Sequence, residues 1–279
     1  MVSERYAVRE LLMCGIAGII LKPEQGLPDI AARLRMMAGM MHHRGPDDEG
    51  IYIAANGRVG LTNRRLAIRD LSPAGHMPMG NANETVWITY NGEIYNADEL
   101  RVELETAGYR FCSYSDTEVI LHGYEAWGTA VVPRLRGMFA FAIYDQRAGM
   151  EQATLLLARD HLGIKPLYYA QTTTAFVFAS ELKTVLASGL VSREIDPAGL
   201  VGYLQLGGVP NPLTIYREIQ GMPPASWLQL RLTNPDYAQV QTFWQLPLEE
   251  TPDVAAEAAL EQVRTLLAEA VRIRLVSDV

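Results

Sequence analysis

Short runs rich in β-branched and aromatic residues alternate with amphipathic helical segments along residues 14–188. Runs such as "TVWITY" (85–90), "GMFAFAIYD" (137–145) and "AFVFAS" (175–180) have the length of single strands. The runs come in adjacent pairs, and the helical segments are grouped between the pairs. This order predicts an α+β fold of antiparallel sheets covered by helices, rather than a doubly wound parallel sheet.

Several of the helical segments carry start and stop signals. Asp29 precedes a segment whose apolar residues recur at helical spacing, which predicts a capped helix with one buried face. Two further starts have the spacing of capping boxes, and glycines stand where those helices should end: Asn96 with Glu99, Ser115 with Glu118, then Gly108 and Gly128. The helices are therefore expected to be short and sharply bounded.

The chain changes in texture after Gly189, where proline and glycine become frequent. Asp196 and Pro197 have the pattern of a capped helix start within this region, which we expect to connect two domains and to pack on the first. Thr251 and Pro252 are expected to open a long helix with one apolar stripe: Leu260, Val263, Leu267, Ala270 and Leu275. Nothing after this helix could cover the stripe, which predicts a truncated second domain.

Composition excludes several classes of function. A net charge of −8 with dispersed Lys and Arg residues gives no basic surface for nucleic acid or anionic lipid, and no apolar run is long enough to cross a bilayer. The only cysteines, Cys14 and Cys112, provide neither a disulfide framework nor a structural zinc site. We therefore expect no nucleic-acid partner, no membrane, no metal and a cytoplasmic location, with Cys112 in a buried strand.

Cys14 follows Met13 directly and leads into the apolar run "GIAGIIL". A cysteine in an apolar run is more often inert than reactive, because burial disfavours the thiolate. An amino-terminal cysteine differs, because its α-amino group, with a pKa of about 7.7 to 8.0, can accept the thiol proton. Cys14 is therefore a candidate nucleophile if Met13 is a true initiator that is removed.

The segment "HHRGPDDEG" (42–50) gives weaker evidence of a functional site than Cys14 does. The adjacent His42 and His43 point in different directions at a helix end, so a shared metal ion is not expected. Arg44 and Asp47 are expected to form an ion pair across a turn. Arg65, on the following strand, could bind a carboxylate with two parallel hydrogen bonds or could be a solvated charge.

Asn91 and Gly92 follow a strand in "YNGEIYN" (90–96). Asn-Gly is typical of a tight turn. Alternatively, the Asn91 amide and the Gly92 N–H could converge on one oxygen as an oxyanion hole. Asp116 lies at a helix start, where the helix dipole favours a carboxylate in any case.

The order of eight motifs resembles one known family. The motifs are MCGIAG, HHRGPD, RRLAI, NGEIYN, SDTEVI, GMFAFAIYD, ARDHLGIKPLYY and ASELKTVL. Together they resemble the glutamine amidotransferase domain of glutamine-hydrolysing asparagine synthetases, which is an amino-terminal-nucleophile hydrolase with a four-layer α/β/β/α sandwich. The resemblance runs from Met13 to Val279.

The resemblance implies roles for matching residues. Cys14 would attack the side-chain amide of glutamine, giving glutamate and ammonia through a thioester. Asn91 and Gly92 match the oxyanion hole. Arg65, with the backbone of Leu66 to Ile68, matches the site that binds the α-carboxylate. Glu93 and Asp116 match the site that binds the α-ammonium group.

The resemblance also divides the chain. It implies a leader (1–13), an amidotransferase domain (14–190), a connecting segment (191–250) and the start of a truncated synthetase domain (251–279). Because the leader lacks the features of a pro-segment, a misplaced start is expected, while a cleaved leader or an inactive protein stays open. The ATP-pyrophosphatase motif SGGLDS of the family is missing.

We therefore expect no cofactor for glutamine hydrolysis, and ATP with magnesium only in the absent synthetase domain. Glutamine is the expected partner, and a separate synthetase chain or a homo-oligomer stays open. Two alternative functions also stay open: ammonia delivery to another acceptor, and a non-catalytic fragment that binds glutamine or a partner chain.

Overall fold

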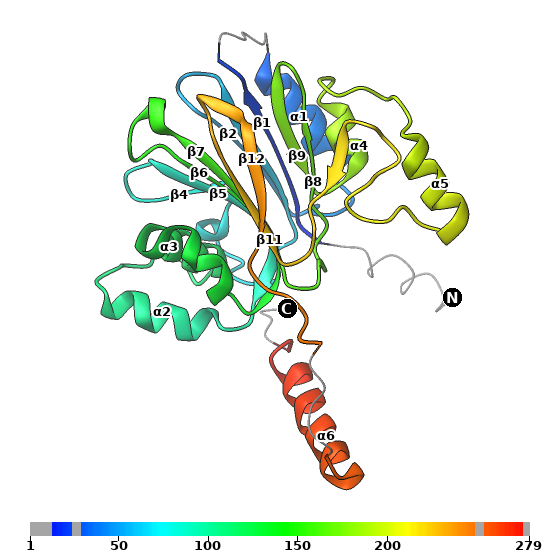
Figure 1. Ribbon diagram of the computed structural model, residues 1–279. Helices are drawn as coiled ribbons and strands as arrows, with labels where there is room; N and C mark the ends of the chain where they lie inside the picture. Colours follow the sequence, from blue (N-terminus) through cyan, green and yellow to red (C-terminus); the bar gives the residue numbers. More distant parts are fainter. Residues whose placement is uncertain (1–12, 24–28, 249–253, 276–279) are drawn as a thin grey trace, which may run out of the picture.

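Two six-stranded antiparallel sheets form the centre of the molecule (Figure 1). The computed structural model describes residues 13–23, 29–248 and 254–275. The first sheet has the order β10 (Ile219–Gly221), β8 (Tyr168–Gln171), β9 (Ala175–Ala179), β1 (Gly15–Leu21), β3 (Val59–Arg65) and β2 (Asp48–Ile53). The second has the order β12 (Asn234–Thr242), β11 (Ser226–Arg231), β7 (Thr154–Arg159), β6 (Gly137–Asp145), β5 (Val86–Ile94) and β4 (Met79–Gly80).

Strand alternation sorts the apolar residues into three layers of core. In β6, Phe139, Phe141 and Ile143 face the helices, whereas Ala142 and Tyr144 face the first sheet. The strand β1 follows the same rule, since Ile16 and Ile20 point between the sheets and Ala17, Ile19 and Leu21 point outward. Each central strand is therefore buried on both faces.

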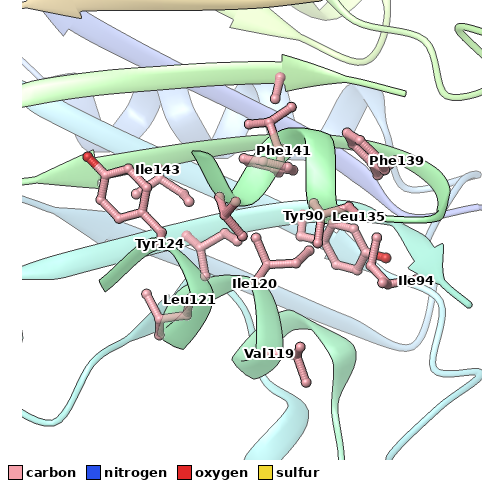
Figure 2. Packing of buried hydrophobic residues seen from close by; sticks show 14 of the residues in the cluster. Tyr90, Ile94, Val119, Ile120, Leu121, Tyr124, Leu135, Phe139, Phe141 and Ile143 are labelled. Carbon is pink, nitrogen blue, oxygen red and sulfur yellow. The ribbon is translucent and has the colours of Figure 1, made fainter. Parts of the chain in front are cut away.

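Helices cover both outer faces. The helices α1 (Ile30–Met40) and α4 (Leu182–Ala187) pack on the first sheet, and α2 (Ala97–Thr106) and α3 (Asp116–Trp127) pack on the second. Figure 2 shows Ile120 and Tyr124 of α3 on the side of the helix that faces β6, with Tyr124 beside Ile143. Short 3₁₀ turns lie at Pro73–Gly75, Gly128–Arg134 and Met150–Gln152. The predicted α/β/β/α sandwich is confirmed.

The helix caps follow the predictions in part. Asp29 accepts a hydrogen bond from the Ala32 N–H, and Gly108 and Gly128 follow the ends of α2 and α3 with positive φ. The Asn96–Glu99 capping box is not formed, because the Asn96 side chain instead bonds the backbone of Arg134 and Arg136.

The second capping box forms only on one side. Ser115 accepts a hydrogen bond from the Thr117 N–H, as an N-cap does. Glu118, however, turns to the loop before α3, where its carboxylate accepts hydrogen bonds from the N–H groups of Cys112 and Ser113. The carboxylate thus orders the loop rather than the first turn of α3.

The prediction of a buried strand at Cys112 is wrong. Cys112 lies in the loop between α2 and α3, and its side chain is exposed. Its neighbour Phe111 packs against the helical core layer and lies edge-on to His122. One aromatic residue therefore anchors this loop without strand pairing.

The expected connecting segment adds strands to both sheets. Asp196 caps α5 (Pro197–Leu206) as predicted, by accepting a hydrogen bond from the Ala198 N–H. Beyond α5, β10 pairs with β8, and β11 pairs with β7. Within residues 191–248, the described part of this segment, β10 and β11 thus pack on what precedes them, and the sheets continue past residue 190. The division into domains at 190 and 250 stays a prediction.

The helix α6 (Ala256–Arg272) stands away from the sheets (Figure 1). Within its predicted stripe, Leu260, Val263, Leu267 and Leu275 are at least half exposed, whereas Ala270 is partly buried. Its predicted start at Thr251 and Pro252, and residues 1–12 of the predicted leader, lie outside the described residues. Across the described part of the chain, none of the helices combines the length and apolar character that spanning a membrane would require.

Candidate active site

One pocket lies where the start of β1 meets the end of β3, the second half of β5 and the start of α3. It encloses about 610 Å³ of empty space, including its open mouth, which suits a small molecule. Every residue predicted for the site lines this pocket: Cys14, Arg65, Leu66, Ile68, Asn91, Gly92, Glu93 and Asp116.

Cys14 lies immediately before β1 with its sulfur at the pocket wall. The Leu66 N–H donates a hydrogen bond to Cys14 Sγ at 3.3 Å, and the thiol donates to the Leu66 carbonyl at 3.6 Å. Burial raises the pKa of the Cys14 thiol, and the bond with Leu66 and the positive charges of Arg65 and Lys165 oppose this rise. The site therefore holds the sulfur in place, and cations favour its ionised form.

Arg44 fixes the backbone around Cys14, and the predicted ion pair between Arg44 and Asp47 is wrong. Arg44 Nε donates to the Cys14 carbonyl at 3.1 Å, and Nη1 pairs with Glu181 at 3.2 Å. Asp47 instead accepts a hydrogen bond from the Ala67 N–H at 2.8 Å. A carbonyl and a carboxylate thus bind Nε and Nη1 of the buried guanidinium, whereas Nη2 has no hydrogen-bond partner among the described residues.

The two adjacent histidines differ in their surroundings. His43 pairs with Glu181, with 3.0 Å between Nε2 and Oε1, and His42 is exposed. No group of three or more His, Cys, Asp or Glu side chains that could hold a metal ion is found within the described residues.

Asn91 and Gly92 lie inside β5, which continues to Ile94, so the tight-turn alternative is wrong. Gly92 is paired with Phe139 of β6, whose own N–H and C=O are engaged with Asp160 on the opposite side. Since the N–H groups of an antiparallel strand alternate in direction, the Gly92 N–H points away from β6. Ile94, two residues on, points the same way and donates its N–H to Asp116 at 2.9 Å.

The Asn91 side chain supplies a second donor. Its Nδ2 is buried and has no hydrogen-bond partner within the described part of the chain. A Cβ atom at Gly92 would lie 2.3 Å from the Met138 carbonyl oxygen, so only glycine fits there. The two neighbouring residues therefore bring an unused amide donor and an outward-facing N–H to the pocket beside Cys14.

Arg65 ends β3 and is buried at the pocket wall. Its Nη2 donates to the carbonyl oxygens of Arg69 and Asp70, which anchors the guanidinium to the following loop. Ile68 of this loop is 41% exposed and lies at the pocket rim. The guanidinium is thus preorganised, because two backbone carbonyls hold it at the wall.

Two carboxyl groups, those of Glu93 and Asp116, also line the pocket. Asp116 Oδ2 accepts hydrogen bonds from Tyr90 Oη at 2.7 Å and from the Ile94 N–H at 2.9 Å. Burial raises the pKa of Asp116, and burial together with the charge of Asp116 raises the pKa of Glu93. The charge of Asp116 thus lowers the acidity of Glu93, and a bound cation would relieve that repulsion.

Lys165 is a residue of this pocket that the sequence analysis did not single out. It is 6% exposed, and its ammonium lies 3.1 Å from Met13 Sδ. The available signal was its position as a single charge in the otherwise apolar part of "GIKPLYY". Pattern alone could not show that this charge is buried beside Cys14.

Residues 13–244 match the family model described as the glutamine amidotransferase domain, so the chain belongs to that family. Two relatives from Bacillus subtilis are named asparagine synthetase [glutamine-hydrolyzing] 3 and 1. They are 35% identical over 270 residues and 36% identical over 272 residues. Each alignment covers 96% of this chain, but 42% and 41% of the relatives.

Solved structures share the fold. A glutamine phosphoribosylpyrophosphate amidotransferase from B. subtilis, complexed with ADP and GMP, has a TM-score of 0.57 and 20% identity, and the match covers 84% of this chain and 50% of that one. The structure of an allosteric regulatory enzyme of purine biosynthesis has a TM-score of 0.59, 19% identity and the same coverage. The predicted family resemblance is confirmed, and the glutaminase reading is favoured over a non-catalytic fragment.

Proposed function

We propose that this chain hydrolyses the side-chain amide of glutamine to glutamate and ammonia, with Cys14 as the nucleophile. One observation supports this above the others: the pocket that holds the Cys14 sulfur also holds the buried, unpartnered Asn91 Nδ2. A buried donor left unpaired costs about 1–3 kcal/mol, so a partner that arises during a reaction accounts for it. The oxyanion formed on an attacked amide is such a partner.

The amide attack needs a base, and we propose that the active form begins at Cys14. The free α-amino group would take the thiol proton as the sulfur attacks the amide carbon, which forms the C–S bond and places the electron pair on oxygen. Asn91 Nδ2 and the Gly92 N–H would stabilise this oxyanion. The electron pair then returns, the C–N bond breaks, and the proton passes from the α-amino group to the departing ammonia.

Water completes the cycle. With the α-amino group again as base, water attacks the thioester carbon, the C–O bond forms and the C–S bond breaks, which releases glutamate and restores the thiol. We propose no cofactor for this sequence of steps.

The same pocket offers complementary charges for the amino-acid end of glutamine. Arg65 would bind the α-carboxylate, together with the backbone from Leu66 to Ile68. Glu93 and Asp116 would bind the α-ammonium group, which supplies the cation that these crowded carboxylates lack. A small zwitterion thus matches the charged groups of the pocket.

The chain spans about half the length or less of the curated relatives it matches. We propose that its ammonia serves the ATP-dependent and magnesium-dependent amidation of aspartate, in a synthetase unit outside this chain. The partner would be a separate synthetase chain or a further copy in an oligomer, in a reducing cytoplasmic compartment. Delivery of ammonia to another acceptor remains the second candidate.

Replacing Cys14 tests the proposal. Cys14→Ala should reduce ammonia release from glutamine to background, while the binding of glutamine stays measurable by calorimetry. Cys112→Ser is the matched control, because its exposed side chain lies in the loop between α2 and α3, and it should leave turnover unchanged. Undiminished ammonia release by the Cys14→Ala protein would refute the assignment of the nucleophile.

A further inference from the structure

Lys165 is a buried cation held at the pocket of Cys14. It lies in the loop between β7 and β8, where its N–H donates to Asp160 Oδ2 at 2.9 Å and its carbonyl accepts from Arg159 Nε at 2.7 Å. These two bonds fix the backbone on both sides of the residue. From this fixed backbone the Lys165 side chain, which is 6% exposed, lines the pocket.

The ammonium has no anionic partner within the part of the chain that the structure describes. Its one side-chain hydrogen bond goes to Met13 Sδ at 3.1 Å, and a thioether is a weak acceptor. A buried charge without a counter-ion costs several kcal/mol of desolvation. Accordingly, burial lowers the pKa of Lys165, whereas the neighbouring Cys14, Glu93 and Asp160 raise it.

The other cations near Cys14 have assigned partners. Arg44 is bonded to the Cys14 carbonyl and to Glu181, and Arg65 is bonded to two backbone carbonyls. Among the negative groups, Asp116 also faces Cys14. Lys165 is thus the described cation facing this sulfur whose charge no carboxylate or carbonyl oxygen satisfies.

We propose that Lys165 is a positioning residue that favours the loss of one proton from the Cys14 thiol and amino group, and so keeps the nucleophile in its reactive form. The inference rests on the proposed function in one respect, the role of Cys14 as nucleophile. When thiol and amino group are both protonated, the pair carries one positive charge, which the Lys165 ammonium repels. Loss of one proton to solvent gives the neutral, reactive pair.

The position of Met13 supports this assignment. Met13 is the residue bonded to the Cys14 nitrogen, and its side chain contacts the Lys165 ammonium. In a protein that begins at Cys14, this thioether contact is absent, and a free amino group replaces the peptide nitrogen that joins Met13 to Cys14. Met13 contacts the Lys165 ammonium, and removal of Met13 would also create the free amino group beside the Cys14 thiol.

The pH profile of kcat/KM for glutamine tests the inference. Lys165→Met removes the charge but keeps an unbranched apolar side chain, and it should move the acidic limb upward by about one pH unit. At pH values below the limb, kcat/KM should then fall about tenfold, whereas above the limb it should change less than about twofold. Lys165→Arg should keep the limb of the native protein.

Lys22→Met is the matched control, because Lys22 follows the far end of β1, at about 3.3 Å per residue some 26 Å from Cys14. It should leave the limb unchanged. Lys165→Gln repeats the test if the methionine variant does not fold, as judged by thermal unfolding.

A second readout needs no glutamine. In a Cys112→Ser background, the rate of Cys14 alkylation by iodoacetamide is measured against pH, and Lys165→Met should shift this profile upward as well. Suppose that the native protein releases ammonia and that both pH profiles of the variant stay within about 0.3 pH unit of the native profiles, which amounts to no shift. The inference about Lys165 is then overturned, and the proposed function stands. If the native protein releases no ammonia, the proposed function fails, and the alkylation profile alone supports or overturns the inference.

Discussion

Asn91 shows how one side chain distinguishes a catalytic pocket from a structural one. Its Nδ2 is buried without a partner, although buried amide donors are almost always paired. At the neighbouring position 92, the backbone of β6 leaves no room for a Cβ atom, so only glycine fits there. The N–H of Gly92 points away from β6. Both features fit donors kept free for an oxygen that gains charge during the reaction.

Asn91→Ala should therefore lower kcat for ammonia release on the order of 10² to 10³, with KM for glutamine little changed, because the lost donor acts in the transition state. Thermal unfolding should be nearly unaffected by the loss of Nδ2, since this atom makes no hydrogen bond to the described residues. Steady-state kinetics and calorimetry measure the two effects. A kcat close to that of the native protein would remove Asn91 from the mechanism.

The sequence identified the residues of the site but not their bonding. The motifs placed Cys14, Arg65, Asn91 and Asp116 in one pocket, and the structure gathers them there. The pattern could not show that Asn-Gly lies inside a strand, because the same dipeptide is typical of turns. It also could not show which donors are already paired, and for this reason the role of Arg44 was mistaken and Lys165 was missed.

The helix α3 presents Asp116 to the pocket and is braced two turns later by a buried charged cluster. His122 Nδ1 lies 2.8 Å from Glu125 Oε2, and His122 Nε2 lies 3.6 Å from Glu118 Oε1. Desolvation of His122 is outweighed by the hydrogen bond to Glu125 and the ion pair with Glu118, which together raise the pKa of His122 to about 9, and the charged histidine helps lower the pKa of Glu118 to about 2. The helix is thus held by a charged histidine.

The sign of the pH effect follows from these shifts. A histidine whose folded pKa exceeds its unfolded value stabilises the fold fully below about pH 6.5, and this stabilisation is lost as the pH rises through about 9. The Glu118 contribution has the opposite sense, being present above the ordinary glutamate pKa and lost as the pH falls through about 2.

His122→Gln should therefore destabilise the protein more at pH 6 than at pH 9.5, by at most about 3 kcal/mol. Urea unfolding of the native and variant proteins at the two pH values measures this difference. His42→Gln is the control, because this side chain is exposed at the end of α1. An equal loss of unfolding free energy at both pH values would contradict a charged His122.

Elements were predictable where the local pattern and the burial agree. The run "GMFAFAIYD" has the bounds of β6, and Asp29 caps α1 as predicted. The prediction of a strand at Cys112 was wrong because the aromatic side chain of Phe111 packs against the core and orders this loop without strand pairing. The prediction of a capping box at Asn96 was wrong because its side chain bonds backbone groups that are distant in sequence, and spacing along the chain does not reveal such partners.

The fold of the whole molecule brings segments that are distant in sequence to one pocket. Stacking the two sheets sets the start of β1 against β5, and the loop after β7 reaches the same place, so residues 14, 91 and 165 become neighbours. Antiparallel sheets covered by helices were predictable from paired strands between helical segments, whereas the four-layer order of the sandwich was implied by the family resemblance. The strands β10 to β12 were not foreseen, because their Pro-rich and Gly-rich surroundings favoured a connecting segment.

The exposed stripe of α6 fits a chain that spans about half the length or less of its relatives. Two contacts join this region to loops beside β5 and β6: the ion pair of Glu269 with Arg136 at 3.0 Å, and Arg274, just after α6, over the ring of Tyr95 at 5.0 Å. The ion pair joins two exposed side chains, so it adds little to stability.

The central claim is that the thiol of Cys14 is activated by the free amino group of the same residue. Intact-mass measurement of the protein, fractionated by its glutaminase activity, tests this claim most directly. The account predicts that all of the active protein has the mass of a chain whose first residue is Cys14. Full activity in a fraction whose mass still includes Met13 would contradict it.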